Sequence, residues 1–316
     1  MTAVRAASVV AQCKVNLFLR VLARESGGYH QLETLFCRLA LGDGVTVRET
    51  GGERTLDITG EALPAGGVGP TERNLAWRAA LAYTSAAGWP KGFAIEIDKR
   101  IPVGGGLGGG SADAGAVLRC LNALAPAPMP PDALLRIGAM LGADVPFLTQ
   151  DVSPLALAWG RGDRMLTVPP LPSRRCVLVC FPFGVSTADA YRWLAESPAA
   201  APTAVAYDAE SLASWGVIER LAYNEFERVV TPHLPPLAAG LAALRQGRRA
   251  SGDGVVLLSG SGSTIFVLPG SSGSELGTHG EPDELEAPSP RTVAVEGARS
   301  EESSTSASVE PVRLHE

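Results

Sequence analysis

Residues 102–113 read PVGGGLGGGSAD, with six glycines in the seven positions from Gly104 to Gly110. Glycine has no Cβ, so the backbone of such a segment can adopt positive φ angles and approach a ligand closely. The apolar run that follows, residues 112–124, predicts a helix, and the free N–H groups at the start of a helix attract anions. We therefore expect a loop that binds phosphate at the N-terminus of a helix.

Two common nucleotide-binding motifs do not fit this loop. Gly104, Gly106 and Gly109 match the dinucleotide fingerprint G-x-G-x-x-G, but that motif calls for an acidic residue about 20 positions further on. Residues 114–131 contain none, which argues against a Rossmann oxidoreductase. The Walker pattern fails because no lysine precedes Ser111. A flexible linker is a further alternative, but linkers do not usually run straight into an apolar helix.

Composition indicates a globular protein. The 316 residues are enough for two domains, and 46% of them are hydrophobic. No apolar run approaches the length of a membrane span, and no secretory signal is evident. The five cysteines are scattered and odd in number, so we expect reduced thiols and a cytoplasmic location. Cys176 and Cys180 have no His or Cys neighbours at ligand spacing, so we expect no metal site there.

The net charge of −6 is concentrated at the end of the chain. Residues 270–316 hold nine glutamates, one aspartate and three arginines, a charge of −7, which leaves +1 for residues 1–269. This body has no basic run and no aromatic residues interleaved with arginines, so we expect no nucleic-acid or membrane partner. The end segment is rich in Ser, Gly, Glu and Pro, which predicts a disordered acidic tail in which only residues 291–296 resemble a strand.

Hydrophobic periodicity predicts an α+β order of elements. The strands expected in the first half are residues 9–22, 31–41, 44–49, 56–59 and 93–97. The helices expected there are 74–87, 112–124 and 132–141, the last ending at Gly142, with Pro146 preventing its continuation. A second domain is expected from near residue 165, with strands at 176–181 and 264–268 and helices at 187–196, 224–230 and 237–244.

Polar residues stand out at two places on these elements. Lys14 and Asn16 share one face of the first strand, because alternate side chains of a strand point the same way. Asp144 lies in the loop that leaves the helix 132–141. The chain has only three lysines, Lys14 and Lys99 among them, against 24 arginines, so a lysine kept against this bias is a candidate for a chemical role.

Six segments together resemble the GHMP small-molecule kinases. They are Lys14-Val-Asn16, Gly28-Tyr-His30, Ile97-Asp-Lys-Arg-Ile-Pro102, the glycine loop with Ser111, Gly142-Ala-Asp-Val-Pro-Phe147 and Gly260-Ser-Gly-Ser263. The glycine loop alone is typical of the whole family. Gly-Tyr-His and Gly-Ala-Asp-Val-Pro-Phe resemble the members that use ATP to phosphorylate the 2-hydroxyl of 4-(cytidine 5'-diphospho)-2-C-methyl-D-erythritol in the non-mevalonate isoprenoid pathway. The resemblance spans about residues 9–268.

The resemblance implies an α+β GHMP kinase architecture. Residues 1–165 would form an ATP-binding domain with the ribosomal-protein-S5-like fold, and residues 166–270 a ferredoxin-like domain. Residues 271–316 would be an acidic tail that contributes a last strand at 291–296. The small-molecule substrate and ATP would lie in the cleft between the domains, with Mg²⁺ as cofactor.

The resemblance also implies roles for individual residues. Asp144 matches the catalytic base, since a carboxylate accepts the proton of an attacking hydroxyl. Lys14 matches the catalytic lysine, which orients Asp144 and offsets negative charge on the transferred phosphoryl group. The residues expected to contact ATP are Pro102, Val103, Gly104, Gly105, Gly106, Leu107, Gly108, Gly109, Gly110, Ser111, Ala112, Asn74 and Lys99. Ser111 is also the candidate Mg²⁺ ligand.

The substrate is expected to meet a second group of residues. They are Asn16, Tyr29, His30, Tyr191, Gly260, Ser261 and Gly262. Tyr29 and His30 match a cytidine site, where an aromatic ring stacks on cytosine and an imidazole hydrogen-bonds its edge. Tyr191 would supply the opposite stacking face.

Several of these residues also have a purely structural interpretation that the sequence leaves open. Asp144 would then cap a helix end, and Ser111 would be the N-cap of the helix after the glycine loop. Asn74 and Lys99 would be surface residues. Tyr29 and His30 would be a buried pair.

The chain departs from the family pattern after Leu268. A helix and a final strand are expected there, but the chain has Gly270-Ser-Ser-Gly273 and only a weak helical pattern at residues 274–286. A nucleotide-binding protein without turnover is therefore one alternative, and a GHMP kinase acting on homoserine, mevalonate or a sugar is another. Retention of both Lys14 and Asp144 favours an enzyme, because a binding protein needs neither a base nor a charge clamp.

Overall fold

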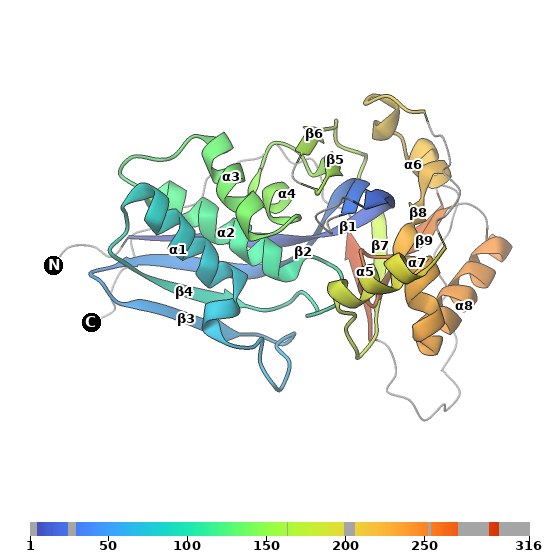
Figure 1. Ribbon diagram of the computed structural model, residues 1–316, viewed down its shortest axis with the longest axis horizontal. Coiled ribbons are helices and arrows are strands. Elements are labelled where there is room, and N and C mark those ends of the chain that lie inside the picture. Colours follow the sequence, from blue (N-terminus) through green and yellow to red (C-terminus); the bar gives the residue numbers. More distant parts are fainter. Residues whose placement is uncertain are drawn as a thin grey trace.

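The computed structural model describes residues 5–24, 30–162, 164–198, 206–251, 254–270 and 291–296. These residues form two sheets with helices packed against both (Figure 1). The first sheet has the order β3-β4-β2-β1-β8, with β5 paired to β2 and β6 paired to β5, and the second has the order β11-β7-β10-β9. The expected α+β class is confirmed.

Two long antiparallel strands form the centre of the first sheet. β1 (Ala6–Arg24) and β2 (His30–Thr50) pair from Ala6 opposite Arg48 to Arg24 opposite His30. The two strands predicted at 31–41 and 44–49 are one continuous strand, because Gly42 and Gly44 stay in the ladder opposite β1. The remaining strands of this sheet are β3 (Arg54–Thr59), β4 (Gly92–Asp98), β5 (Leu155–Gly160), β6 (Arg164–Thr167) and β8 (Tyr223–Asn224).

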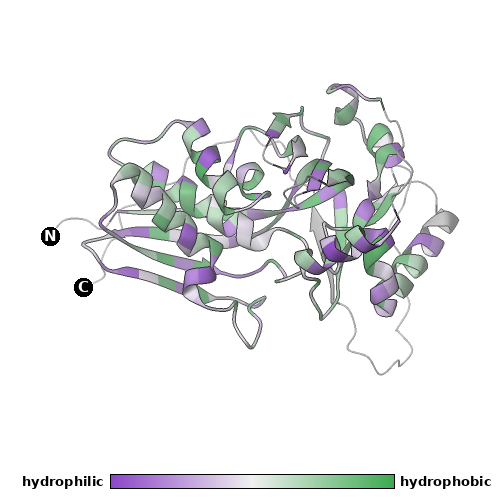
Figure 2. Ribbon diagram, in the orientation of Figure 1, coloured by the Kyte–Doolittle hydropathy of each residue, from purple (hydrophilic) through white to green (hydrophobic). Residues whose placement is uncertain are grey.

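Four helices lie on one side of the first sheet (Figure 1). They are α1 (Leu75–Ala87), α2 (Gly109–Leu124), α3 (Pro131–Leu141) and α4 (Val145–Thr149). Figure 2 shows hydrophobic residues concentrated on α2, and nearly all of this helix from Ala112 onward is buried. The small residues of α2 allow this burial, because they let its backbone approach its neighbours.

The helix α4 is absent from the sequence prediction. The helix predicted at 132–141 ends before Pro146, as expected, but Pro146 itself occupies the first turn of α4, where the missing N–H has no intrahelical acceptor to lose. Gly142 does follow α3 as expected, but its φ of 174° is extended rather than left-handed. The chain therefore makes a sharp break at 142–144 and starts a new helix immediately.

The second sheet has its own covering helices. β7 (Arg175–Cys180) pairs antiparallel with β10 (Thr264–Pro269) and with β11 (Arg291–Glu296), and β10 also pairs with β9 (Gly254–Leu258). The helices of this half are α5 (Thr187–Glu196), α6 (Trp215–Leu221), α7 (Glu225–Val230) and α8 (Pro235–Ser251). A separate cluster of buried aliphatic and aromatic residues joins α5, α7 and α8 to this sheet.

The end of the chain contributes the strand that the family pattern requires. β11 completes the second sheet beside β7, so the strand expected at 291–296 is present. Residues 271–290 and 297–316 of the predicted tail lie outside the described residues. The domain boundary near residue 165 stays a prediction, and β8, from beyond it, adds to the first sheet by pairing in parallel with Phe18 and Leu19.

Short 3₁₀ turns connect several of these elements, at Thr71–Arg73, Ser211–Ala213 and Thr231–His233. All five cysteines are free thiols. Within the described ranges, no helix has both the length and the apolar character that crossing a membrane would require.

A glycine inside α2 sets the distance between α2 and α4. A Cβ at Gly115 would lie 2.7 Å from the carbonyl oxygen of Leu148 and 2.9 Å from the backbone nitrogen of Thr149. Backbone atoms cannot turn aside as a flexible side chain can. Close packing of the two helices therefore depends on glycine here.

We expect Gly115→Ala to lower the melting temperature of the protein. The methyl group would push α4 away from α2, at a cost of about 1–3 kcal/mol, although alanine normally favours a helix over glycine. Gly247→Ala is the matched control, because Gly247 lies in α8 with no atom within 4 Å of the Cβ position. Thermal unfolding checks both variants, and an equal or higher melting temperature for Gly115→Ala would contradict the packing argument.

Candidate active site

Lys14 lies where β1, the glycine loop and α4 meet. It is 3% exposed. Its Nζ donates hydrogen bonds to Asn16 Oδ1 at 2.8 Å and to the carbonyl oxygen of Gly106 at 3.1 Å, and lies 3.2 Å from Asp144 Oδ2. The expectation that Lys14 and Asn16 project together is confirmed by their direct hydrogen bond.

A chain of hydrogen bonds fixes Asn16. Its Nδ2 donates to Thr34 Oγ1 at 2.8 Å, and the Thr34 hydroxyl donates to the carbonyl oxygen of Phe18 at 2.7 Å. Thr34 is 1% exposed. The buried side of the site is therefore preorganised, because these successive hydrogen bonds hold the Asn16 amide in one orientation.

Asp144 occupies the N-cap position of α4, but its side chain does not cap the helix. The interpretation of Asp144 as a structural cap is therefore wrong. Its side chain is 31% exposed, while that of its partner Lys14 is 4% exposed. The carboxylate of Asp144 is thus accessible from one side, while the buried ammonium of Lys14 pairs with it on the other.

The glycine loop needs glycine at its centre for two reasons. Gly106 and Gly108 have φ angles of 79° and 73°, which strain any other residue. A Cβ at Gly106 would also overlap the carbonyl oxygen of Ser259, and one at Gly108 would lie 3.1 Å from Lys14 Cε. The loop therefore packs directly against the catalytic lysine candidate.

The helix α2 begins at Gly109 with Gly108 as its N-cap and without a side-chain cap. Its first N–H groups are thus left for solvent or an anion. Ser111 is the third residue of the helix and not its N-cap, so the capping interpretation of Ser111 is wrong. Its half-buried position at the start of α2 is compatible with a phosphate contact.

A second loop, residues 259–263, packs on the glycine loop. Ser259 Oγ donates to the carbonyl oxygen of Gly106 at 3.0 Å, and a Cβ at Gly262 would overlap the backbone of Gly105 and Gly106. A Cβ at Gly260 would lie 3.4 Å from Lys14 Nζ. The expected residues Gly260 and Gly262 are therefore at the site.

Two polar residues that the sequence analysis missed support this second loop. Asn224 Nδ2 donates to the carbonyl oxygens of Leu258 and Gly260 at 2.7 and 2.8 Å, while its Oδ1 caps α7. Thr187 Oγ1 lies 3.0 Å from Ser261 Oγ. Asparagine is a common N-cap, so the sequence could suggest that Asn224 caps a helix. Its contact with the second loop could not be found in this way, because Gly260 lies 36 positions away.

A group of aromatic rings lies near enough to Asp144 for its charge to act on one of them, Tyr191. His30 and Tyr191 stack with ring centroids 4.6 Å apart, and Phe226 packs edge-on to Tyr191 at 5.0 Å. Burial, together with the charge of Asp144, raises the pKa of Tyr191 to about 12. A base between His30 and Tyr191 would need about twice the observed separation, so these two rings do not form the two sides of a slot. Tyr29 lies outside the described residues.

Asn74 and Lys99 have partners within the protein. Asn74 Oδ1 accepts a hydrogen bond from the backbone N–H of Ala76 and caps α1. Lys99 is 3% exposed, so its interpretation as a surface residue is wrong. Its Nζ pairs with Asp43 and, at 2.8 Å, with Asp113.

Comparisons with known proteins agree with this geometry. Residues 74–152 match the family described as "GHMP kinases N terminal domain". The 4-diphosphocytidyl-2-C-methyl-D-erythritol kinase of Moorella thermoacetica is 38% identical over 259 residues, which cover 80% of this chain and 86% of that protein. The chain belongs to the GHMP kinases. The Deinococcus radiodurans enzyme of the same name is 39% identical over 259 residues, covering 82% of each chain.

Solved structures place this GHMP kinase in the same fold. A crystal structure of 4-(cytidine 5'-diphospho)-2C-methyl-D-erythritol kinase has a TM-score of 0.66 at 33% identity, covering 92% of this chain and all of that one. The mevalonate kinase of Methanococcus jannaschii has a TM-score of 0.52 at 12% identity, which shows a shared fold. The expected GHMP architecture is confirmed.

The buried cluster of Lys99, Asp43 and Asp113 contacts both ends of the glycine loop of this GHMP kinase. Asp43 Oδ1 accepts hydrogen bonds from the backbone N–H groups of Arg100 and Ile101, at 2.6 and 2.8 Å, where the chain enters the loop. Asp113 lies in α2, where the chain leaves the loop. Lys99 therefore joins the two ends of the loop through one carboxylate at each end.

The charges of this cluster do not balance. Two carboxylates share one ammonium, and Asp113 Oδ1 has no hydrogen-bond partner in the described part of the chain. Burial raises the pKa of Asp113 to about 7, and the negative charge of Asp43 adds to this, while Lys99 opposes it. Burial alone would lower the pKa of Lys99, but Asp113 and Asp43 raise it above its ordinary value.

We expect Asp113→Asn to stabilise the protein, and to do so more at pH 8 than at pH 5. The pKa of Asp113 is raised in the folded chain from 3.8 to about 7, so protonation of this carboxyl favours the folded state at low pH. This contribution to the free energy of folding is lost as the pH rises from 3.8 to about 7. Asparagine keeps the shape and the acceptor for Lys99 without the charge. Thermal unfolding at both pH values should give a gain of about 1 kcal/mol or more at pH 8.

The matched control for this measurement is Asp132→Asn. The Asp132 side chain is 65% exposed and pairs with Arg136 across one turn of α3, so its removal should change stability little at either pH. A gain for Asp113→Asn that is independent of pH would contradict the assignment of the titrating group.

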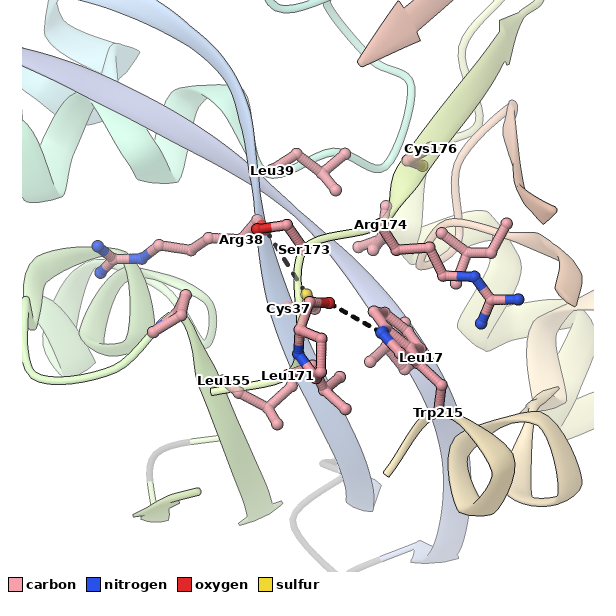
Figure 3. Close-up of a pocket in the computed structure, with 14 residues that line it drawn as sticks. Leu17, Cys37, Arg38, Leu39, Leu155, Leu171, Ser173, Arg174, Cys176 and Trp215 are labelled. Atoms are coloured by element: carbon pink, nitrogen blue, oxygen red, sulfur yellow. Dashed lines mark hydrogen bonds between the residues drawn. The ribbon is translucent and has the colours of Figure 1, made fainter. Parts of the chain in front are cut away.

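A cavity of about 30 Å³ lies elsewhere, between β1, β2, residues 171–174 and α6 (Figure 3). It is lined by Val15 and Leu17, which alternate with Lys14 and Asn16 along β1, so it opens on the other face of the strand. Its size leaves room for little more than a water molecule. The cavity is therefore not the nucleotide or substrate site.

Proposed function

We propose that this GHMP kinase transfers the γ-phosphoryl group of ATP to the 2-hydroxyl of 4-(cytidine 5'-diphospho)-2-C-methyl-D-erythritol. The observation that carries the proposal is the pairing of Lys14 with a solvent-accessible Asp144 at the edge of the glycine loop. The names of the relatives at 38% and 39% identity support the choice of substrate.

The chemistry follows from where each group lies. The glycine loop and the start of α2 would hold the phosphates on backbone N–H groups, and the dipole of α2 favours their charge. The substrate hydroxyl attacks the γ-phosphorus, its proton passes to the carboxylate of Asp144, and the bond to the bridging oxygen breaks to release ADP. The ammonium of Lys14 keeps Asp144 oriented and offsets the charge on the transferred group.

Mg²⁺ would accompany the nucleotide. Within the described ranges, no group of three His, Cys, Asp or Glu side chains is arranged to hold a metal ion. This fits Mg²⁺, which keeps several waters and binds through substrate phosphates and one or two protein oxygens. The hydroxyl of Ser111 is the proposed protein ligand, and the ion would neutralise phosphate charge.

The cytidine portion would bind at the aromatic group beside Asp144. His30 and Tyr191 already stack on each other, so the cytosine would stack on one side of this pair and not between its rings. Tyr29, adjacent to His30 in the chain, is the proposed second face, and the imidazole of His30 is the proposed hydrogen-bond partner for the base. Asn16, Gly260, Ser261 and Gly262 would contact the remainder of the substrate.

The non-catalytic alternative loses its main support. It rested on the departure from the family pattern after Leu268, but β11 completes the second sheet. A binding protein would also gain nothing from holding a buried ammonium against an accessible carboxylate.

We expect Asp144→Asn to lower kcat by about 10²–10⁴-fold while ATP still binds, because the acceptor for the hydroxyl proton is lost. The measurement is coupled ADP release with ATP, Mg²⁺ and the cytidylylated substrate, with mevalonate and homoserine as competing acceptors. Asp132→Asn is the control and should keep full activity, since that carboxylate is exposed on α3. Undiminished turnover by Asp144→Asn, or equal turnover of mevalonate or homoserine, would refute the proposal.

A further inference from the structure

Arg38 is a buried cation to which the proposed reaction assigns no role. It lies in β2 directly opposite Lys14 in the β1–β2 ladder, so both side chains project from the same face of the sheet. It is 7% exposed. Figure 3 shows its side chain pointing away from the other labelled side chains, so only its backbone belongs to the cavity wall.

The guanidinium of Arg38 binds the C-terminal end of α4. Its Nη2 donates to the carbonyl oxygen of Phe147 at 2.7 Å and to that of Gln150. Carbonyls at a helix end have no partner within the helix and carry a partial negative charge, which an arginine satisfies. Lys14 thus contacts the N-terminal end of α4, through Asp144, and Arg38 contacts the C-terminal end.

The helix α4 depends on such contacts because it has only five residues. A helix this short is not stable by itself in water. The Phe147 ring stacks on Phe36 at 5.0 Å, and the guanidinium carbon of Arg38 lies 5.3 Å from the Phe147 ring centroid. These contacts tie the C-terminal end of α4 to β2, while α2 and α3 pack along the rest of the helix. They therefore contribute to the orientation of α4 and of the Asp144 that precedes it.

The surroundings of Arg38 are unfavourable to a charge. Burial lowers its pKa, the like charge of Arg119 from α2 lowers it further, and Asp151, just after α4, opposes this. The Nε atoms of Arg38 and Arg119 have no hydrogen-bond partner among the described residues. An apolar side chain at such a position is often as stable as a buried charge or more so, so stability alone does not explain an arginine here.

We propose that Arg38 is a positioning residue that sets the orientation of Asp144 by anchoring the C-terminal carbonyls of α4. The inference rests on the proposed function for the role of Asp144, but the anchoring itself does not depend on it. Among the described residues, the hydrogen bonds of the Arg38 guanidinium go to Phe147 and Gln150, and none goes to the glycine loop.

The first test is the kinetic effect of Arg38→Met, which keeps the aliphatic stem and removes the donors. Because a displacement of the base by about 1 Å costs on the order of 10²-fold in rate, kcat should fall by about 10–100-fold. The KM for ATP should change by less than about twofold, since the glycine loop is intact. Arg38→Lys should recover part of kcat, and Arg136→Met on the exposed face of α3 is the matched control.

A double variant separates positioning from a general structural role. In an Asp144→Asn background, Arg38→Met should cause no further loss of kcat, because its only route to the reaction has been removed. An equal loss in both backgrounds, or an unchanged kcat for Arg38→Met, would overturn the proposal. The melting temperatures of both variants show whether each is folded at the assay temperature. If Arg38→Met is unfolded there, the double-variant test is made with Arg38→Lys instead.

Hydrogen exchange gives a readout that needs no turnover. In Arg38→Met, the backbone amides of residues 145 and 147–150 should exchange faster than in the unaltered protein, while those of α2 should not. If the unaltered protein fails to phosphorylate the cytidylylated substrate, the proposed function is wrong, and the exchange result still decides the anchoring. Unchanged exchange at residues 145 and 147–150 would refute it.

Discussion

The ammonium group of Lys14 has three acceptors, and each belongs to a different part of the structure. Asn16 is in the same strand, Gly106 is in the glycine loop and Asp144 begins α4. A buried ammonium without these partners would be strongly unfavourable, so the loop and α4 are constrained to approach it together. The phosphate-binding loop and the accessible carboxylate are neighbours for this reason.

The two buried lysines show how surroundings determine a role. Lys14 pairs with a carboxylate that is one-third exposed, so a substrate can reach the pair from the open side. Lys99 pairs with two carboxylates that are both at least nine-tenths buried, so no ligand reaches them without a rearrangement. Lys14 is therefore suited to chemistry, and Lys99 to holding the two ends of the glycine loop at a fixed separation.

Local sequence predicted much of this site, because the relevant signals lie within a few residues. The period of a strand placed Lys14 and Asn16 on one face, and the run of glycines before an apolar helix indicated the phosphate loop. The helix α4 could not be predicted in this way, because five residues are too few to show a helical period and Pro146 reads as a helix breaker. The partners of Lys99 lie 56 and 14 positions away, and the carbonyls bound by Arg38 lie 109 and 112 positions away. Such contacts arise only once the sheet has formed.

In the proposed reaction, Asp144, held by Lys14, receives the proton of the attacking hydroxyl beside phosphates bound on the glycine loop. The most direct measurement is a crystal structure with a non-hydrolysable ATP analogue and the cytidylylated methylerythritol bound together. We expect the γ-phosphate on the backbone amides of residues 104–110 and the 2-hydroxyl about 2.6–3.2 Å from the Asp144 carboxylate. A hydroxyl beyond reach of Asp144 would rule out its role as the base, and a triphosphate bound away from the glycine loop would rule out the loop as the phosphate site.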